Sequence, residues 1–234
     1  MITKLRGFSP AACVFDAYGT LFDIASAVRH RAAAVADSGP ALIETWRAKQ
    51  LQYTWLRSLQ GQYVNFEKVT ADALDYALEV SNIDDDLLRD QLLALYRTLD
   101  PFPDAVSALR QLRAAGMRSL ILSNGTPAML DSAVRAAGLE SLLDGILSVE
   151  SVRVYKPDPR VYQLAVERLG VQAERIAFIS ANGWDAHAGA QFGLSAIWCN
   201  RPGQPGERLP GKLRHVLSSL EELPGVLGVG EAAS

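Results

Sequence analysis

The sequence predicts an α/β protein with a doubly wound, mostly parallel sheet and a small helical domain inserted after its first strand. Two observations predict this fold. Short apolar runs that end in polar or glycine-containing turns alternate with amphipathic helical stretches, which is the pattern of right-handed βαβ units. One long early segment breaks the alternation, because it is rich in Ala, Leu, Arg and Gln and contains no convincing strand.

Four apolar runs are expected to form buried parallel strands. They lie at 11–15, 118–122, 175–179 and 194–199. A polar or glycine-containing turn follows each run, as is typical of a strand that leads into a loop. In a parallel sheet, ligands bind beyond the carboxyl ends of the strands. The polar residues after these strands are therefore expected to meet in one crevice.

Helices are expected between the strands and throughout the insert. Three helices are expected between the strands, at 103–115, 127–137 and 158–169, and a glycine directly follows each of them. In the insert, helical apolar spacing recurs at 44–59, 70–79 and 86–99. Proline at 101 and 103 marks the return to the core. The expected domains are a core of 1–23 and 101–234 and a helical domain of 24–100.

Composition narrows the class of protein. The 234 residues are 49% hydrophobic and carry a net charge of −3, so we expect a globular protein with no basic face for nucleic acid. There is no apolar run of membrane-spanning length and no secretory signal near the start, so no membrane association is expected. The two cysteines lie far apart, which favours a reduced, cytoplasmic enzyme over a disulfide framework or a zinc site.

Asp16 and Lys156 are the first candidates for chemistry. Asp16 follows an apolar run and opens a glycine turn, which fits either a turn-forming Asp or a nucleophile or metal ligand at a strand end. Lys156 precedes a proline in a loop before a helix. A loop lysine is usually solvated, but a lysine facing Asp16 would keep that carboxylate ionised.

Four motifs resemble the haloacid dehalogenase superfamily, and more narrowly its L-2-haloacid dehalogenases (type II). They are F-D-A-Y-G-T-L at 15–21, S-N-G at 123–125, K-P-D at 156–158 and S-A-N-G-W-D at 180–185. The segments W-R-A-K-Q-L at 46–51 and Y-V-N-F at 63–66 resemble the cap of those enzymes. The resemblance covers about 10–203 and implies a Rossmann-like core with a helical cap. It also implies a homodimer, for which the apolar stretch 53–59 offers an interface.

The resemblance further implies hydrolysis of short (S)-2-haloacids through an aspartyl ester, with inversion to the (R)-2-hydroxy acid. Asp16 is expected to attack carbon and become the ester. Thr20 is expected to donate to the oxygens of Asp16. Asp185, the remaining carboxylate of the last loop, is the candidate base that activates water to hydrolyse the ester. The supporting catalytic residues are expected to be Lys156, Tyr162, Ser180 and Asn182.

Substrate binding is expected to depend on Arg47, to which the resemblance assigns substrate binding and halide capture. Its planar, permanently charged guanidinium suits an anion. Other expected contacts are groups at the strand ends, Ala17, Tyr18, Ser123 and Asn124, and side chains walling the alkyl group, Leu51, Phe66 and Trp184. Each of these residues could equally be an ordinary turn or core residue with no part in binding.

Two departures from the phosphatases of this superfamily argue against a metal. Phosphatases carry D-x-D, whereas Tyr18 stands at the second acidic position, and its ordinary pKa of about 10 makes it a poor acid near neutrality. Ala181 stands where a magnesium-binding carboxylate is expected and cannot ligate a hard cation. We therefore expect no metal and no other cofactor. A magnesium-dependent phosphatase of the same superfamily and a non-catalytic binding protein on this scaffold remain the alternatives.

Overall fold

The computed structural model describes residues 8–35 and 38–229, and its centre is a six-stranded sheet in which every neighbouring pair is parallel. The strand order is β3-β2-β1-β4-β5-β6. The strands are β1 (Ala12–Phe15), β2 (Ser119–Ser123), β3 (Gly145–Ser148), β4 (Ile176–Ser180), β5 (Ser195–Cys199) and β6 (His215–Leu217). The α/β prediction is confirmed, and the four expected strands form the middle of the sheet.

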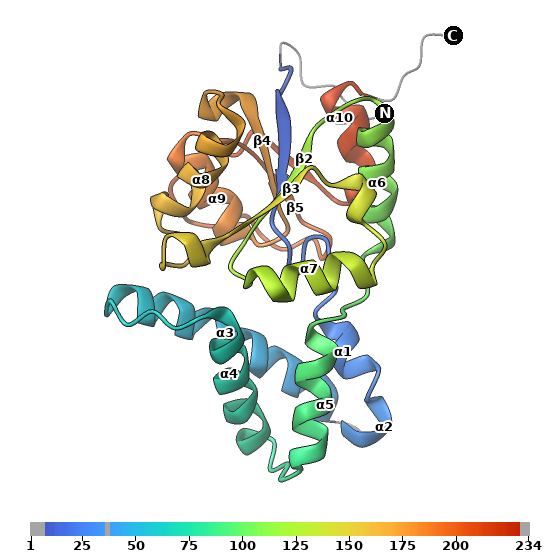
Figure 1. Ribbon diagram of the computed structural model, residues 1–234, viewed down its shortest axis with the longest axis vertical. Helices are drawn as coiled ribbons and strands as arrows, with labels where there is room; N and C mark the ends of the chain where they lie inside the picture. Colours follow the sequence, from blue (N-terminus) through green and yellow to red (C-terminus); the bar gives the residue numbers. More distant parts are fainter. Residues whose placement is uncertain (1–7, 36–37, 230–234) are drawn as a thin grey trace.

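Helices cover both faces of this sheet, as a doubly wound fold requires (Figure 1). On one side lie α6 (Pro103–Ala114) and α10 (Leu223–Leu227), and on the other lie α8 (Pro159–Leu169) and α9 (Gly183–Phe192). A further helix, α7 (Pro127–Ala136), follows β2. Local signals set these ends: Asp158 caps α8 by accepting a bond from the Arg160 amide, and Gly170 ends that helix in the left-handed region.

A group of helices connects β1 to α6 and lies apart from the sheet in Figure 1. It consists of α1 (Ala25–Arg29), α2 (Ala32–Val35), α3 (Gly39–Leu59), α4 (Phe66–Val80) and α5 (Asp86–Tyr96). Both α3 and α4 begin earlier than the sequence predicts, at residues 39 and 66 instead of 44 and 70. The start of α4 is set by Asn65, whose side chain accepts the Lys68 amide.

Two strands were not predicted from the sequence. β3 and β6 are the two edges of the sheet, with four and three residues respectively. An edge strand has one pairing partner and is partly exposed, so it does not need a continuous apolar run. Neither segment therefore carries a strong strand pattern.

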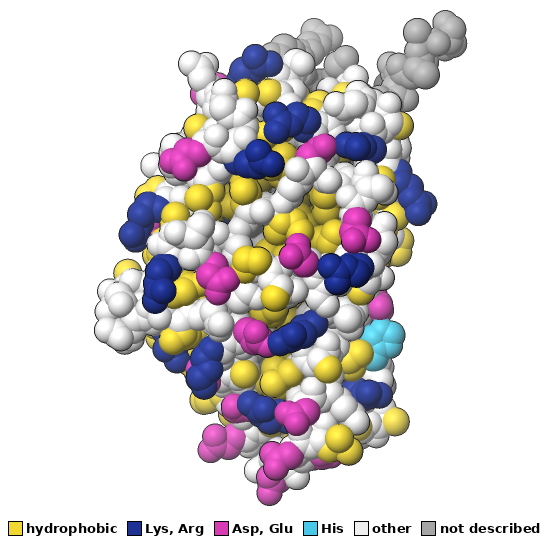
Figure 2. All heavy atoms as spheres, viewed as in Figure 1, with side chains coloured by type: hydrophobic (Ala, Val, Ile, Leu, Met, Phe, Trp, Pro, Cys, Tyr) yellow, Lys and Arg dark blue, Asp and Glu magenta, His cyan; other side chains and the backbone are white. Residues whose placement is uncertain are grey.

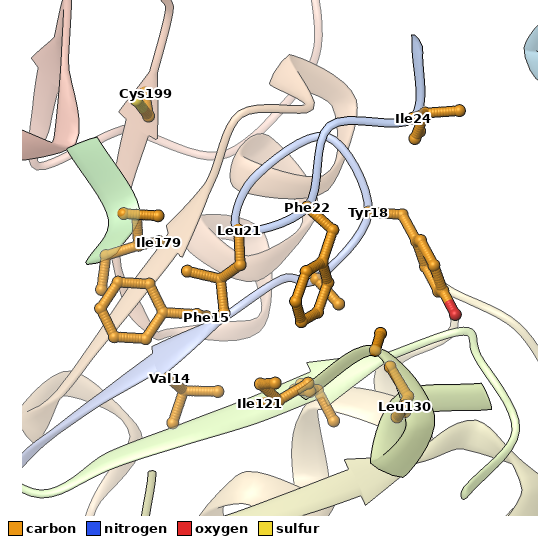
Figure 3. Close-up of a cluster of buried hydrophobic side chains, with 14 of the residues drawn as sticks. Val14, Phe15, Tyr18, Leu21, Phe22, Ile24, Ile121, Leu130, Ile179 and Cys199 are labelled. Carbon is orange, nitrogen blue, oxygen red and sulfur yellow. The ribbon is translucent and has the colours of Figure 1, made fainter. Parts of the chain in front are cut away.

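The core lies where the central strands pack side by side. In Figure 3, Phe15 of β1 lies near Ile121 of β2 and Ile179 of β4, which are its partners in register. Figure 2 shows charges of both signs interspersed on one face of the molecule. Within the described residues, no helix has the length and hydropathy needed to cross a bilayer.

Candidate active site

The carboxyl ends of three central strands and one helix of the insert bring the polar candidates together. Asp16 directly follows β1, Asn124 follows β2, and Asn182 follows β4. Arg47 reaches this place from α3, because its guanidinium contacts Asn182. The polar candidates therefore meet at one place, with the insert on one side of it.

Three donors hold the carboxylate of Asp16. Lys156 Nζ lies 3.0 Å from Oδ1, while Thr20 Oγ1 donates to Oδ2 at 2.9 Å and Asn182 Nδ2 at 2.7 Å. The Asp16 side chain is nearly buried. A carboxylate fixed in this way has one orientation and little water around it, which is the state that a carboxylate nucleophile needs.

The Asp16 loop is shaped by Gly19 and tied to the loop after β4. Gly19 has φ of 88°, a conformation that residues with a side chain rarely adopt. Beside it, Thr20 Oγ1 accepts the amide of Ala181 at 2.8 Å while donating to Asp16. The hydroxyl of Thr20 thus donates to one loop and accepts from the other, and it joins two strand ends.

Lys156 is a buried residue that bridges two carboxylates, so the alternative of a solvated loop lysine is wrong. Its Nζ lies 3.0 Å from Asp16 Oδ1 and 2.8 Å from Asp185 Oδ2. Burial by itself lowers the pKa of Lys156, but the two carboxylates outweigh burial and raise that pKa above its ordinary value. The ammonium therefore keeps its proton.

Asp185 is fully buried in the first turn of α9. Its Oδ1 accepts the hydroxyl of Tyr162 at 2.7 Å. Burial raises the pKa of Asp185, and the neighbouring Lys156 works against this shift. Burial also raises the pKa of Tyr162 well above its ordinary value, so its hydroxyl keeps its proton and donates.

Arg47 connects the insert to the core. Its Nη2 lies 3.3 Å from Asn182 Oδ1 and 3.4 Å from the carbonyl oxygen of Tyr18. Both contacts are long for hydrogen bonds to a guanidinium. An anionic ligand at this place can therefore accept shorter bonds from the guanidinium in their stead.

The remaining polar candidates shape the loops around the site. Ser123 Oγ accepts the Gly125 amide at 3.1 Å, and Ser180 Oγ accepts the Asn182 amide at 3.1 Å. Asn124 Oδ1 accepts the Lys156 amide at 3.1 Å, which ties the lysine loop to β2. Ser123 and Ser180 therefore stabilise turns, as the alternative interpretation of these residues expects, and Asn124 holds the loop that carries Lys156.

The apolar candidates have different surroundings. Phe66 is buried and packs against Tyr18, with ring centroids 5.5 Å apart. Trp184 packs edge-on against Trp55 of α3 at 5.4 Å, and both line an apolar groove of about 750 Å³ between α3 and the core. Leu51 is half-buried on α3, one turn after Arg47.

Ala17 and Tyr18 directly follow the Asp16 carboxylate, and both are buried. Burial raises the pKa of the Tyr18 hydroxyl well above its ordinary value, so this side chain cannot act as an acid near neutral pH. Its carbonyl oxygen accepts a bond from Asn182 Nδ2 at 3.2 Å. Tyr18 therefore contributes packing and backbone contacts.

Two residues of the site were missed. Gln50 is fully buried and accepts a bond from Arg47 Nη1 at 2.7 Å. Arg201, after β5, donates to the carbonyl oxygens of Gly19 and Thr20 at 3.1 and 2.9 Å. Gln50 could have been predicted from the sequence, since it lies three residues after Arg47 on one face of the same helix. Arg201 could not, because only the folded chain brings it to the Asp16 loop.

Across residues 8–35 and 38–229, no cluster of three or more His, Cys, Asp or Glu side chains is arranged to hold a metal ion. The carboxylates of Asp16 and Asp185 both bond to the ammonium of Lys156. A fixed positive charge is therefore already present between them.

Comparisons with known proteins identify the family. The model of the haloacid dehalogenase-like hydrolases matches residues 10–193. The chain is 44% identical to (S)-2-haloacid dehalogenase 4A of Burkholderia cepacia over 224 residues, 95% of this chain and 95% of the relative.

Solved structures agree. A dehalogenase solved with an intermediate complex superposes with a TM-score of 0.92 at 41% identity, covering 96% of this chain and 99% of that chain. The L-2-haloacid dehalogenase of Xanthobacter autotrophicus, with chloropropionic acid covalently bound, gives a TM-score of 0.86 at 35% identity, covering 95% of this chain and 100% of that chain. The chain therefore belongs to the haloacid dehalogenase-like hydrolases, and within them to the L-2-haloacid dehalogenase family.

Proposed function

We propose that this protein hydrolyses short (S)-2-haloalkanoic acids to (R)-2-hydroxy acids and halide through a covalent ester on Asp16. The observation that carries the proposal is the buried Asp16 carboxylate, which Lys156, Thr20 and Asn182 hold beside the guanidinium of Arg47. Asp16 supplies a nucleophile of fixed direction. Arg47 supplies a positive charge for the carboxylate of the substrate and for the departing halide.

In the first step, an oxygen of Asp16 forms a bond to C2 of the substrate. The carbon–halogen bond breaks, and its electron pair leaves with the halide. Attack from behind the leaving group inverts C2 once. The nearly buried site removes the water that would otherwise stabilise the carboxylate and slow its attack.

In the second step, water attacks the side-chain carbonyl carbon of the Asp16 ester. Asp185 accepts a proton from this water, and its raised pKa makes it a better base than an exposed aspartate. Lys156 and Thr20 stabilise the oxyanion that forms, a role supported by their bonds to the two oxygens of Asp16. The ester then breaks at its carbonyl, the proton passes to the alkoxide, and the hydroxy acid leaves.

The structure of the L-2-haloacid dehalogenase of Xanthobacter autotrophicus with chloropropionic acid covalently bound supports a covalent route on this fold. In our proposal, the amides of Ala17 and Tyr18 and the side chains of Ser123 and Asn124 hold the substrate carboxylate. The alkyl group meets apolar side chains, for which Leu51, Phe66 and Trp184 are the candidates.

We also propose that the active form is a homodimer. Leu56 and Leu59 on α3 are 44% and 85% exposed. Leu59 also lines the apolar groove that contains Trp55 and Trp184. A second copy would bury these side chains. Light scattering should give twice the mass of the chain, and Leu59→Glu should reduce it to one chain; a monomeric native protein contradicts the proposal.

The activity is tested by halide release. Purified protein is incubated with each enantiomer of 2-chloropropionate, and chloride and lactate are measured. The proposal predicts chloride from the (S)-enantiomer alone, with D-lactate as the product. Hydrolysis of an aryl phosphate with Mg²⁺, in the absence of chloride release, would instead support the phosphatase alternative.

A further inference from the structure

A buried polar cluster lies behind Arg47, at the meeting of α3, α4 and α5. It consists of Gln50, Thr70 and Tyr96, all of which are at most 2% exposed. Gln50 Oε1 accepts bonds from Arg47 Nη1 at 2.7 Å and from the Tyr96 hydroxyl at 3.1 Å. A polar cluster without solvent is costly unless its groups are bonded. The function proposed above does not use it.

The neighbouring hydrogen bonds fix the orientation of the Gln50 side-chain amide. Its Nε2 donates to Thr70 Oγ1 at 2.7 Å, and the proton of that hydroxyl is committed to the carbonyl oxygen of Phe66 at 2.7 Å. Burial raises the pKa of Tyr96, so its hydroxyl keeps its proton and donates. Gln50 therefore presents only its oxygen to Arg47.

This arrangement holds Arg47 without neutralising it. Nη1 is bound by a neutral acceptor, and Nη2 points across to the core with two long contacts, at 3.3 and 3.4 Å. A carboxylate at position 50 would hold the guanidinium equally well but would cancel its charge. The neutral amide of Gln50 orients the guanidinium of Arg47 without reducing its charge.

We propose that Gln50 is a positioning residue that aims Arg47 at the anionic substrate and leaves its full charge available to that anion. The inference rests on the proposed function, since it takes Arg47 as the group that captures the substrate carboxylate. Thr70 and Tyr96 act through Gln50, because they fix which end of its amide faces Arg47.

The test compares two glutamines of the same helix. Gln50→Glu introduces a carboxylate beside Arg47, whereas Gln52→Glu makes the same change on the exposed face, where Gln52 accepts a bond from Lys49 Nζ at 2.9 Å. Propionate, which carries no leaving group, is titrated by calorimetry. We expect Gln50→Glu to weaken propionate binding about tenfold or more, because the new carboxylate cancels the charge of Arg47, an effect comparable in size to one charged hydrogen bond. Gln52→Glu should stay within about twofold, the size of a screened surface effect.

A double-mutant cycle separates positioning from support of the fold. In an Arg47→Met background, Gln50→Glu should change propionate affinity little, because the residue through which Gln50 acts is gone. An equal loss in both backgrounds, or native affinity in Gln50→Glu, overturns the inference. If Gln50→Glu does not fold, Gln50→Met is titrated instead. A smaller but clear loss is then expected, and native affinity is the contradicting result.

Halide release by the native protein is measured alongside. Native turnover with unchanged propionate binding in the Gln50 variants contradicts this inference alone. The absence of chloride release from the native protein contradicts the proposed function itself.

Discussion

At the scale of single residues, the site is a balance of three buried charges. Lys156 bonds to both Asp16 and Asp185, so one ammonium serves two carboxylates. The burial of each group is tolerable only because the others are present. This mutual dependence explains why a loop lysine is buried at all, which the local sequence could not indicate.

The pH dependence of ester hydrolysis follows from these charges. Asp185 acts as a base only when ionised, and burial raises its pKa above the ordinary 3.8. The hydrolysis rate should therefore rise with pH through a midpoint above 3.8. In the free enzyme, where Asp16 is still a carboxylate, Lys156 should keep its proton beyond its ordinary pKa of 10.5, so formation of the ester should persist on the alkaline side. Single-turnover rates across pH test this, and an acid midpoint below 3.8 contradicts the assignment of Asp185.

Arg47→Lys is expected to impair the enzyme although the charge is kept. Lysine lacks the planar fork that lets Arg47 bond to Gln50 while reaching the core. Losing one charged hydrogen bond should lower kcat/KM about 10- to 100-fold, with the melting temperature near that of the native protein. Steady-state kinetics with (S)-2-chloropropionate measure kcat/KM, and near-native values would mean that Arg47 does not bind the substrate.

Chelators are expected to leave halide release unchanged. Ala181 offers no ligand, and Lys156 already supplies the positive charge beside Asp16. The protein is dialysed against chelator and assayed with and without added Mg²⁺. A loss of activity that Mg²⁺ restores is the opposing result.

At the scale of elements, the central strands were predictable and the edges were not. β1, β2, β4 and β5 are fully buried and mainly apolar, so their apolar runs distinguish them in the sequence. β3 and β6 are short and owe their existence to a neighbouring strand that is distant in sequence. No local pattern carries that information.

Arg201 joins three elements around the nucleophile. It forms a bidentate pair with Asp104 at the start of α6, and it donates to the carbonyl oxygens of Gly19 and Thr20. Burial alone would raise the pKa of Asp104, but Arg201 and the Leu220 amide outweigh it and lower that pKa. The pair is therefore charged at neutral pH and fixes the loop that carries Thr20.

Arg201→Ala should slow the attack of Asp16 on substrate, because a small displacement of the nucleophile is costly. We expect about a tenfold to hundredfold slower formation of the Asp16 ester, followed by mass spectrometry in a single turnover. The control is Arg113→Ala, which removes an exposed ion pair between Arg113 of α6 and Asp144. Equal rates in the two variants would mean that Arg201 does not position the loop.

At the scale of the whole molecule, the site draws on residues far apart in the chain. Asp16 and Asn182 are 166 positions apart and still bond at 2.7 Å. Asp16, Arg47 and Asp185 could be predicted because they lie in recognisable motifs. Arg201 and the burial of Lys156 could not, since they depend on how distant parts of the chain pack and on what surrounds each charge.

The central claim is that Asp16 attacks the carbon and that its oxygen becomes the hydroxyl of the product. Asp185 could instead activate water for direct attack on C2. That route also inverts C2, so stereochemistry cannot separate the two. The origin of the oxygen can.

The decisive measurement is a single turnover of (S)-2-chloropropionate by excess enzyme in heavy-oxygen water. Hydrolysis at the ester carbonyl leaves C2 untouched. If Asp16 is the nucleophile, the first turnover gives unlabelled D-lactate, and the heavy oxygen is found in the peptide that contains Asp16. Labelled lactate together with an unlabelled Asp16 peptide would contradict it, even if Asp16→Ala is inactive.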